Sequence, residues 1–179
     1  SVFIAGAAIQ WLRDSLKIID KASDTEKISQ KIPDLENIYV VPAFAGLGAP
    51  YWDMYSRGAI FGLTRDSGRG EIIKATLESL AYQTKDVIDA MEEDSNIKIN
   101  SLKVDGGACM NNYLMQFQSD ILNCEVTRPK IVESTAMGAG YLAGLKSDIW
   151  DISKIKSNQE IDSTFSPQIK DCLLYTSDA

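Results

Sequence analysis

The chain has 179 residues, of which 45% are hydrophobic and 24% charged, so its length allows one sizeable core and predicts a single compact unit. Its formal net charge of −7 argues against electrostatic binding to nucleic acid or to an anionic membrane surface. It contains no histidine, which excludes Ser-His and Cys-His nucleophile pairs and every zinc or iron site that uses histidine.

The N-terminal part of the chain predicts one helix, a loop and two strands. Apolar residues recur with a period of about 3.6 over residues 3–19, which is typical of a helix, and no cap or strand precedes them. Residues 23–37 are polar and predict a loop with at most one helical turn. Short apolar runs at 38–43 and 58–63 predict strands, and the segment 43–53 between them, rich in glycine and aromatic residues, predicts a loop.

The following part of the chain alternates between helix and strand. Residues 71–91 carry a single apolar stripe and predict the longest helix. Further on, the pattern predicts a strand at 101–104, a helix at 112–122 and a strand at 125–128. This order of elements indicates an α/β fold with a largely buried sheet.

A last helix is predicted to start at Ser134, as its N-cap, and to reach Leu145. It is built largely from alanine and glycine, so it could lie very close to a neighbouring sheet or helix. After Ser147 the periodicity fades, and no further element is predicted.

The cysteines and the hydropathy pattern bear on the compartment. Cys109, Cys124 and Cys172 are too few and too unevenly spaced for a disulfide framework or a CxxC metal site. No apolar run approaches the roughly 20 residues of a membrane-spanning helix, and no basic and then apolar leader opens the chain. We therefore expect a cytoplasmic protein with free thiols, without a membrane span and without a nucleic-acid partner.

One stretch, residues 104–112 or V-D-G-G-A-C-M-N-N, combines the end of a strand, a glycine pair and the start of a helix. Backbone N–H groups at such a turn can bind a phosphate or ribose oxygen, and glycine lets a ligand approach the main chain. The alternative is a plain strand-to-helix turn with Asn111 or Asn112 as the helix N-cap. The stretch fits neither the Rossmann GxGxxG pattern nor the P-loop.

Other polar and aromatic residues have simpler explanations. Asp105 is expected to hold the turn by hydrogen-bonding its backbone, so it is not assigned to catalysis. Tyr51 and Trp52 are expected to pack their loop against its own domain or a neighbouring subunit. Cys109, without a basic partner nearby in sequence, is expected to be unreactive.

Residues 58–79, G-A-I-F-G-L-T-R-D-S-G-R-G-E-I-I-K-A-T-L-E-S, resemble the FGGY family of sugar kinases. The shared pattern is a glycine-aromatic strand, a short spacer and a helix of acidic-apolar-x-x-Ala type. The segments S-V-F-I-A-G-A-A-I-Q-W-L-R-D, Y-V-V-P-A-F-A-G-L-G-A-P-Y-W-D, L-E-S-L-A-Y-Q-T and N-Y-L-M-Q-F-Q-S-D-I-L are most similar to the members that phosphorylate glycerol. The resemblance covers about residues 1–167.

The resemblance implies a fold and a division of the chain. In this family two actin-like domains, related to ribonuclease H, close on ATP. Residues 1–146 would form part of the C-terminal, nucleotide-binding domain, incomplete at its N-terminal side, and 147–169 a polar extension of it. Residues 170–179 match nothing in the family and are expected to be a non-native or disordered tail.

The resemblance also implies the ligands. Gly6, Gln10, Gly107 and Asn111 would contact ATP or ADP, which binds with Mg²⁺, and Ala108 would leave room for the nucleotide. From the residues alone, Gly6 is better explained as a close-packing helix glycine and Gln10 as a solvated side chain.

The whole enzyme would transfer phosphate from ATP to glycerol, giving sn-glycerol 3-phosphate in glycerol catabolism. The family's aspartate base and its glycerol contacts lie upstream of this chain, so the chain alone is expected to be inactive, and neither a catalytic residue nor a metal ligand is assigned within it. A homo-oligomer, a dimer or a tetramer, is expected. Two alternatives stay open: another sugar kinase of the family, such as a pentulose kinase, and a non-catalytic actin-like nucleotide-binding module.

Overall fold

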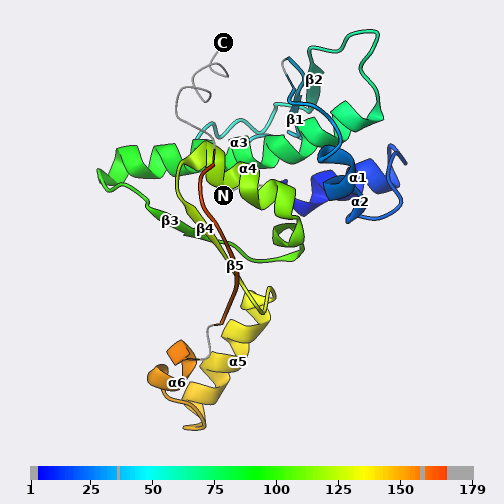
Figure 1. Cartoon of the computed structure of the whole chain (residues 1–179). Helices are drawn as coiled ribbons and strands as arrows, with labels where there is room; N and C mark the ends of the chain where they lie inside the picture. Colours follow the sequence, from blue (N-terminus) through cyan, green and yellow to red (C-terminus); the bar gives the residue numbers. More distant parts are fainter. Residues whose placement is uncertain (1–3, 36, 158–159, 169–179) are drawn as a thin grey trace.

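The computed structural model describes residues 4–35, 37–157 and 160–168 (Figure 1). Cys172 and the tail 170–179 lie outside the described residues. The elements, in chain order, are α1 (Gly6–Asp14), α2 (Asp24–Ser29), β1 (Tyr39–Val41), β2 (Ala59–Phe61), α3 (Arg69–Ser95), β3 (Ser101–Lys103), the 3-10 helix η1 (Gly107–Met110), α4 (Asn112–Leu122), β4 (Glu125–Pro129), α5 (Ser134–Lys146), α6 (Ile152–Ser157) and β5 (Ile161–Phe165).

A small mixed sheet organises the fold, with strands in the order β3-β4-β5. β3 and β4 are parallel, with Leu102 opposite Val126, and the chain crosses between them through η1 and α4. β5 returns antiparallel to β4, with Thr127 opposite Thr164. A separate antiparallel pair, β1-β2, lies against α3. The α/β prediction is therefore confirmed, but the expectation of a largely buried sheet is wrong, because in the described part of the chain β3 and β5 have no buried residue and only β4 is mostly buried.

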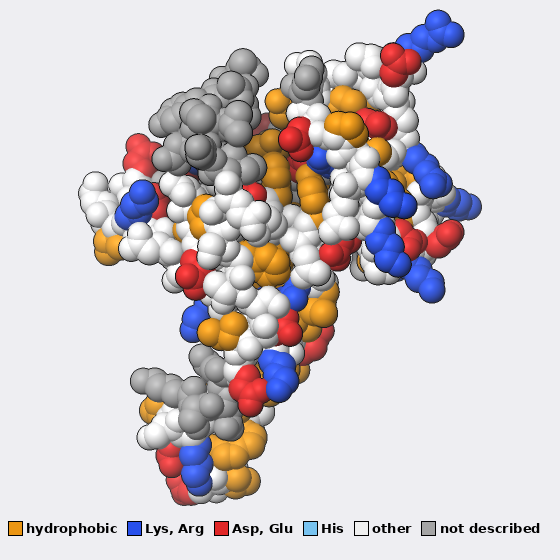
Figure 2. Space-filling view, in the orientation of Figure 1, with side chains coloured by type: hydrophobic (Ala, Val, Ile, Leu, Met, Phe, Trp, Pro, Cys, Tyr) orange, Lys and Arg blue, Asp and Glu red, His pale blue; other side chains and the backbone are white. Residues whose placement is uncertain are grey.

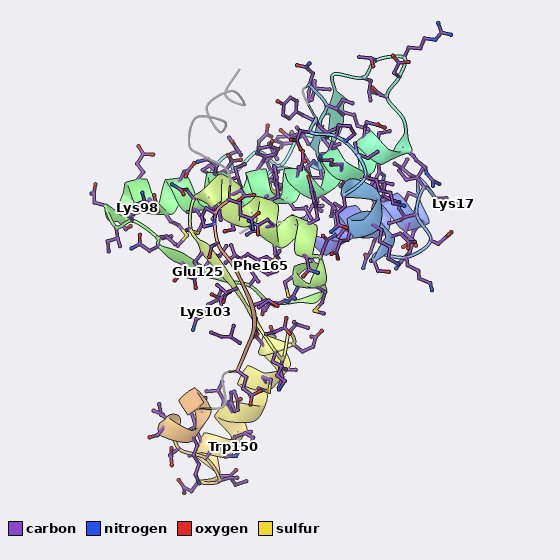
Figure 3. The ribbon with its side chains drawn as sticks, viewed as in Figure 1. Lys17, Lys98, Lys103, Glu125, Trp150 and Phe165 are labelled. Carbon is purple, nitrogen blue, oxygen red and sulfur yellow. The ribbon has the colours of Figure 1, made fainter. Side chains whose placement is uncertain are left out.

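The core lies between the helices and the sheet. α3 and α4 pack together and cross over the strands, and Figure 3 shows Phe165 of β5 close to α4. The N-terminal half of α3 is buried on all sides, and Ile73 and Leu77 have no exposed surface. Leu12 of α1 and Val126 of β4 complete this cluster. Of the helices in the described ranges, not one is both long and apolar enough to cross a membrane.

α3 is longer at both ends than predicted, and each end carries a local feature that fixes where the helix begins or stops. The Glu71 carboxylate accepts a hydrogen bond from the N–H of Gly68 at 2.9 Å, which is a cap that the sequence pattern did not include. At the other end Asn96 takes a left-handed conformation with φ 53°, which stops the helix.

α1 is shorter than predicted. It ends at Asp14, and Lys17 adopts φ 55°, so the chain turns back and buries Ile19 without continuing the helix. The apolar periodicity was right about which residues face the core, but it did not reveal this break.

The predictions for α5 need two corrections. Ser134 lies inside the helix, whose N-cap is Glu133, and no side chain caps it. Its glycines also do not form a close-packed face: no atom lies within 4 Å of a Cβ built on Gly138 or Gly140. Gly144 alone in this helix is buried, against the ring of Trp150. α5 projects from the body of the molecule (Figure 1). Few described residues pack on it, so apolar side chains around it stay exposed (Figure 2).

α6 and β5 occupy a range in which the sequence predicted no element. In I-D-S-T-F the three central residues are polar, so the strand lacks a clear alternating pattern. It forms because β4 offers an edge: Ser163 pairs with Arg128 and Phe165 with Val126.

Candidate functional site

The glycine pair forms a tight turn at the carboxyl end of β3. Gly106 has φ 80° and ψ 170°, a conformation that side chains disfavour, and its N–H donates to the Val132 carbonyl at 2.8 Å. Gly107 then starts η1; it is exposed, and no atom lies within 4 Å of a Cβ built on it. The backbone at this point is therefore open to an approaching group.

A helix begins within a few residues of the glycine pair, as predicted, and the short η1 lies between the pair and α4. One expectation about this turn is wrong. Within the described residues, the Asp105 carboxylate makes no hydrogen bond to the turn, which is held by main-chain bonds such as the one from Cys109 N–H to the Gly106 carbonyl at 3.2 Å.

Asn111 is the N-cap of α4, as one sequence interpretation predicted. Its Oδ1 accepts a hydrogen bond from the Leu114 N–H at 3.0 Å, and its Nδ2 donates to Thr25 Oγ1 at 3.0 Å. The residue is 9% exposed and Thr25 is fully buried. Both the oxygen and the nitrogen of the Asn111 side-chain amide therefore have a partner within the chain. Asn111 fixes the turn through these contacts. Its contact with a nucleotide stays a prediction.

Gly6 and Gln10 lie four residues apart on α1, on one face of the helix, and both are exposed. No atom lies within 4 Å of a Cβ built on Gly6, so it is not a close-packing glycine in this structure. Ile4 and Ala8 of this segment belong to the same buried cluster as Cys109 of η1. The first turn of α1 and the glycine turn therefore rest on a common core.

Arg128 and Thr25 support the turn, and no sequence pattern points to either residue. The Arg128 guanidinium, 6% exposed, donates through Nη1 to the Cys109 carbonyl at 2.9 Å. A buried arginine at the end of a strand has no characteristic spacing, because its partners are distant in sequence.

Cys109 and Cys124 are free and buried. Burial raises the pKa of each thiol above its ordinary value, and for Cys109 the nearby Arg128 opposes the shift only in part. Both thiols are therefore protonated and unreactive at neutral pH, as expected for Cys109. For the described part of the chain, no group of three or more acidic or cysteine side chains could hold a metal ion.

Tyr51, Trp52 and Tyr55 are largely exposed, although the Tyr51 hydroxyl bonds to the carboxylate of Asp86 in α3. They are 58%, 68% and 90% exposed. The first of the two expected explanations, packing against its own domain, therefore holds for Tyr51, whereas for the exposed Trp52 the contact with a neighbouring subunit stays a prediction.

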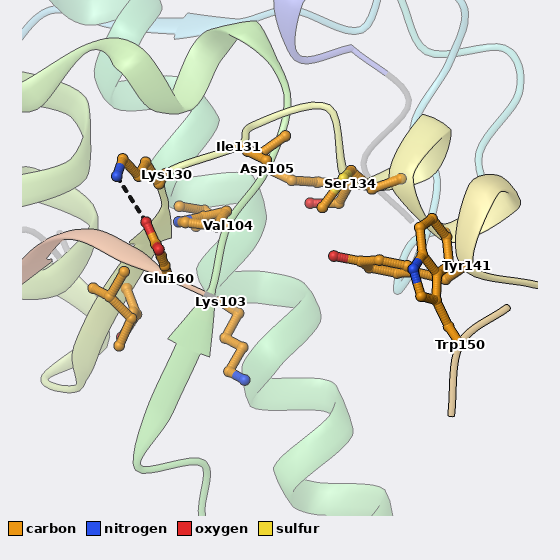
Figure 4. Close-up of a pocket in the computed structure, with 14 residues that line it drawn as sticks. Lys103, Val104, Asp105, Lys130, Ile131, Ser134, Tyr141, Trp150 and Glu160 are labelled. Atoms are coloured by element: carbon orange, nitrogen blue, oxygen red, sulfur yellow. Dashed lines mark hydrogen bonds and ion pairs between the residues drawn. The ribbon is translucent and has the colours of Figure 1, made fainter. Parts of the chain in front are cut away.

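A hollow of about 1050 Å³ lies between the ends of β3 and β4 and the face of α5 (Figure 4). Lys103, Asp105, Lys130, Tyr141, Trp150 and Glu160 are among its lining residues. Lys130 and Glu160 form an ion pair at 2.7 Å on its rim. None of Gly6, Gln10, Gly107 and Asn111 lines it, so we assign it to the loose packing of α5 on the sheet and not to the predicted site.

The architecture matches the actin-like domain of sugar kinases. The structure superposes on Plasmodium falciparum glycerol kinase with ADP at a TM-score of 0.86, with 35% identity, over 98% of this chain and 35% of that one. It also superposes on gluconate kinase from Lactobacillus acidophilus at a TM-score of 0.78, with 25% identity, over 93% of this chain and 34% of that one.

Sequence comparison gives the family. The C-terminal domain of the FGGY family of carbohydrate kinases matches residues 1–147, so the chain belongs to this family. The glycerol kinase of Alkaliphilus oremlandii is 61% identical over 168 residues, which are 93% of this chain and 33% of that protein. The chain spans about a third of the length of the curated relatives that it matches.

Proposed function

We propose that the chain is the C-terminal part of a glycerol kinase, which transfers phosphate from ATP to glycerol to give sn-glycerol 3-phosphate in glycerol catabolism. The observation that carries this proposal is the 61% identity to a glycerol kinase over 93% of the chain, against 25% identity to a gluconate kinase. The same contrast favours glycerol over gluconate as the acceptor of the parent enzyme.

Within the parent, residues 1–146 would belong to the nucleotide-binding domain and 147–169 would extend it. Gly6, Gln10 and Gly107 are exposed, and the backbone at both glycines is open, which suits the close approach of ATP or ADP. The similar Plasmodium kinase was crystallised with ADP, which supports the same ligand here. Asn111 would act mainly by fixing the shape of the turn.

The nucleotide supplies the phosphoryl group, and this chain would hold and orient its donor. Mg²⁺ would arrive with the nucleotide and be coordinated by its phosphates, and no metal ligand is assigned within this chain. No catalytic base is assigned within the chain. A cytoplasmic location and a homo-oligomeric parent, a dimer or a tetramer, are also proposed, and the exposed Tyr51, Trp52 and Tyr55 support the second.

Calorimetric titration with Mg-ADP tests the nucleotide site. We expect the unaltered chain to bind weakly and Gly107→Val to lose binding, because its branched side chain occupies the open backbone. Gly140→Val, at another glycine with no neighbour within 4 Å, is the matched control and should bind as the unaltered chain does. Equal binding by Gly107→Val, with an unchanged circular dichroism spectrum, would contradict the assignment.

A coupled assay tests the division of labour. The chain alone should show no glycerol-dependent consumption of ATP, because the base and the glycerol site are expected elsewhere. Turnover by the chain would overturn this part of the proposal. For the rival of a non-catalytic actin-like module, the discriminating measurement is the same assay on the full-length parent, which a scaffold protein would fail.

A further inference from the structure

The turn at Gly106–Gly107 is joined to β5 by Arg128, a residue of β4. Its Nη1 donates to the Cys109 carbonyl at 2.9 Å and to Asn112 Oδ1 at 3.0 Å. On the other side, Nε donates to Asp162 Oδ2 at 2.9 Å and Nη2 to Ser163 Oγ at 3.1 Å. Every nitrogen of the guanidinium therefore has a partner, and the two sets of partners belong to different elements.

A buried guanidinium would be costly without such partners. Asp162 supplies the countercharge at 2.7 Å from Nη2, and hydrogen bonds from Ser163 and Arg128 lower the pKa of its carboxyl. The ring of Phe165 lies against the guanidinium, with 5.5 Å from Cζ to the ring centroid. The charge pair is therefore formed at neutral pH, and the side chain of Arg128 has one orientation.

The opposite side of the turn is tied to α2. Asn112 Nδ2 donates to Glu26 Oε1 at 3.0 Å, while its Oδ1 accepts from Arg128. Asn111 is held by Thr25 in the same way. The segment that follows Gly107 is thus held between α2 and β5, and the side chain of Arg128 bonds directly to the Cys109 carbonyl of η1.

We propose that Arg128 is a positioning residue for the nucleotide site, which holds the turn after Gly107 in its binding conformation by clamping Cys109 and Asn112 to Asp162. This inference rests on the proposed nucleotide site. It predicts that nucleotide binding depends on the geometry of the guanidinium and not only on its charge. The ammonium group of a lysine at this position lacks the planar fork that bonds to Cys109 and Asn112 on one side and to β5 on the other.

The test compares Arg128→Lys with two controls in the full chain. Ser119→Ala removes buried hydrogen bonds to the carbonyls of Cys124 and Phe165, 2.8 and 3.0 Å long, and so weakens the same helix and strand away from the turn. Lys130→Met removes a positive charge near Arg128 that pairs with Glu160 and has no bond to the turn. Each protein is titrated with Mg-ADP, and amide hydrogen exchange is followed over residues 107–114 without nucleotide.

We expect Arg128→Lys to weaken Mg-ADP binding by about tenfold or more and to speed exchange over 107–114, because charge-assisted bonds are lost. Both controls should bind within about twofold of the unaltered chain, because their contacts do not reach the site. An Arg128→Lys chain that keeps its affinity and its exchange rates would overturn the proposal. So would an equal loss of affinity in Ser119→Ala, because lost stability would then explain both.

The two proposals can fail separately. If the folded, unaltered chain does not bind Mg-ADP, the proposed site fails in this chain, whereas exchange over 107–114 still decides whether Arg128 holds the turn. If Arg128→Lys does not fold, Asp162→Asn replaces it, since it removes the countercharge and leaves the guanidinium. Faster exchange at Cys109–Asn112 in that variant supports the clamp, and unchanged exchange overturns it.

Discussion

At the scale of single residues, Ser29 in α2 is buried at a cost. It has no exposed surface, and its hydroxyl lacks a hydrogen-bond partner among the described residues. We expect Ser29→Ala to raise the free energy of unfolding by about 1 kcal/mol in urea titrations, because the desolvated hydroxyl is removed. Thr25→Val is the contrasting variant: Thr25 Oγ1 donates to the Ala22 carbonyl at 2.6 Å, so stability should fall. A loss of stability in Ser29→Ala would show that the hydroxyl has a partner after all.

Glu78 makes the stability of the chain depend on pH. Burial raises the pKa of its carboxyl above the ordinary 4.5, although the Tyr113 hydroxyl and Lys74 oppose the shift. Above pH 4.5 the folded chain therefore keeps a proton that the unfolded chain has lost, so stability falls as the pH rises through the raised pKa.

Glu78→Gln removes this dependence. We expect its melting temperature, relative to that of the unaltered chain, to increase with pH from about 4.5 and to level off above the raised pKa. The other carboxylates titrate in both proteins and cancel in the difference. A difference that stays constant across the window would contradict the assignment of the shift to Glu78.

At the scale of elements, the end of α5 depends on one glycine. A Cβ on Gly144 would collide with the ring of Trp150, and the Gly144 carbonyl accepts the N–H groups of Ile149 and Trp150 at 2.9 and 3.3 Å. We expect Gly144→Ala to displace Trp150 and to speed amide exchange over residues 142–150. Gly140→Ala, where nothing lies within 4 Å, should slow exchange in α5, because alanine favours a helix by about 1 kcal/mol over glycine. Equal exchange in the two variants would mean that Trp150 does not pack as described.

The elements that sequence could predict are those with local signals. α4 runs from Asn112 to Leu122, as predicted, because Asn111 caps one end and Asn123 turns left-handed at the other. The break after α1 and the strand β5 carry no such signal. β5 depends on pairing with β4, and the burial of Arg128 depends on β5, so both follow from contacts between distant parts of the chain.

The candidate site likewise has features that the sequence could predict and features that it could not. The glycine turn and the cap at Asn111 were predictable, because glycine pairs and N-caps act within a few residues. The supports of the turn, Thr25 and Arg128, were not, because each meets its partner only in the folded molecule.

At the scale of the whole molecule, α5 and the loop after it carry an exposed apolar surface. Leu142 and Ile149 are 70% and 65% exposed, and Figure 2 shows apolar side chains gathered in this part. We expect the chain to self-associate as its concentration rises, and the double variant Leu142→Lys, Ile149→Lys to reduce association in sedimentation experiments. Lys substitutions at Glu125 and Asp89, which are already polar and exposed, provide the control. Unchanged association in the double variant would place the contact elsewhere.

The clamp on the turn has a consequence for the order in which the molecule is made. Arg128 follows Cys109 by 19 positions, but Asp162 follows Arg128 by a further 34. β3, η1, α4 and β4 are contiguous, so a ribosome releases this unit before the partner of its arginine has been synthesised. The turn can then form early, but the ion pair between Arg128 and Asp162 can form only after β5 has been synthesised, so a newly made chain passes through an interval in which the turn lacks this support.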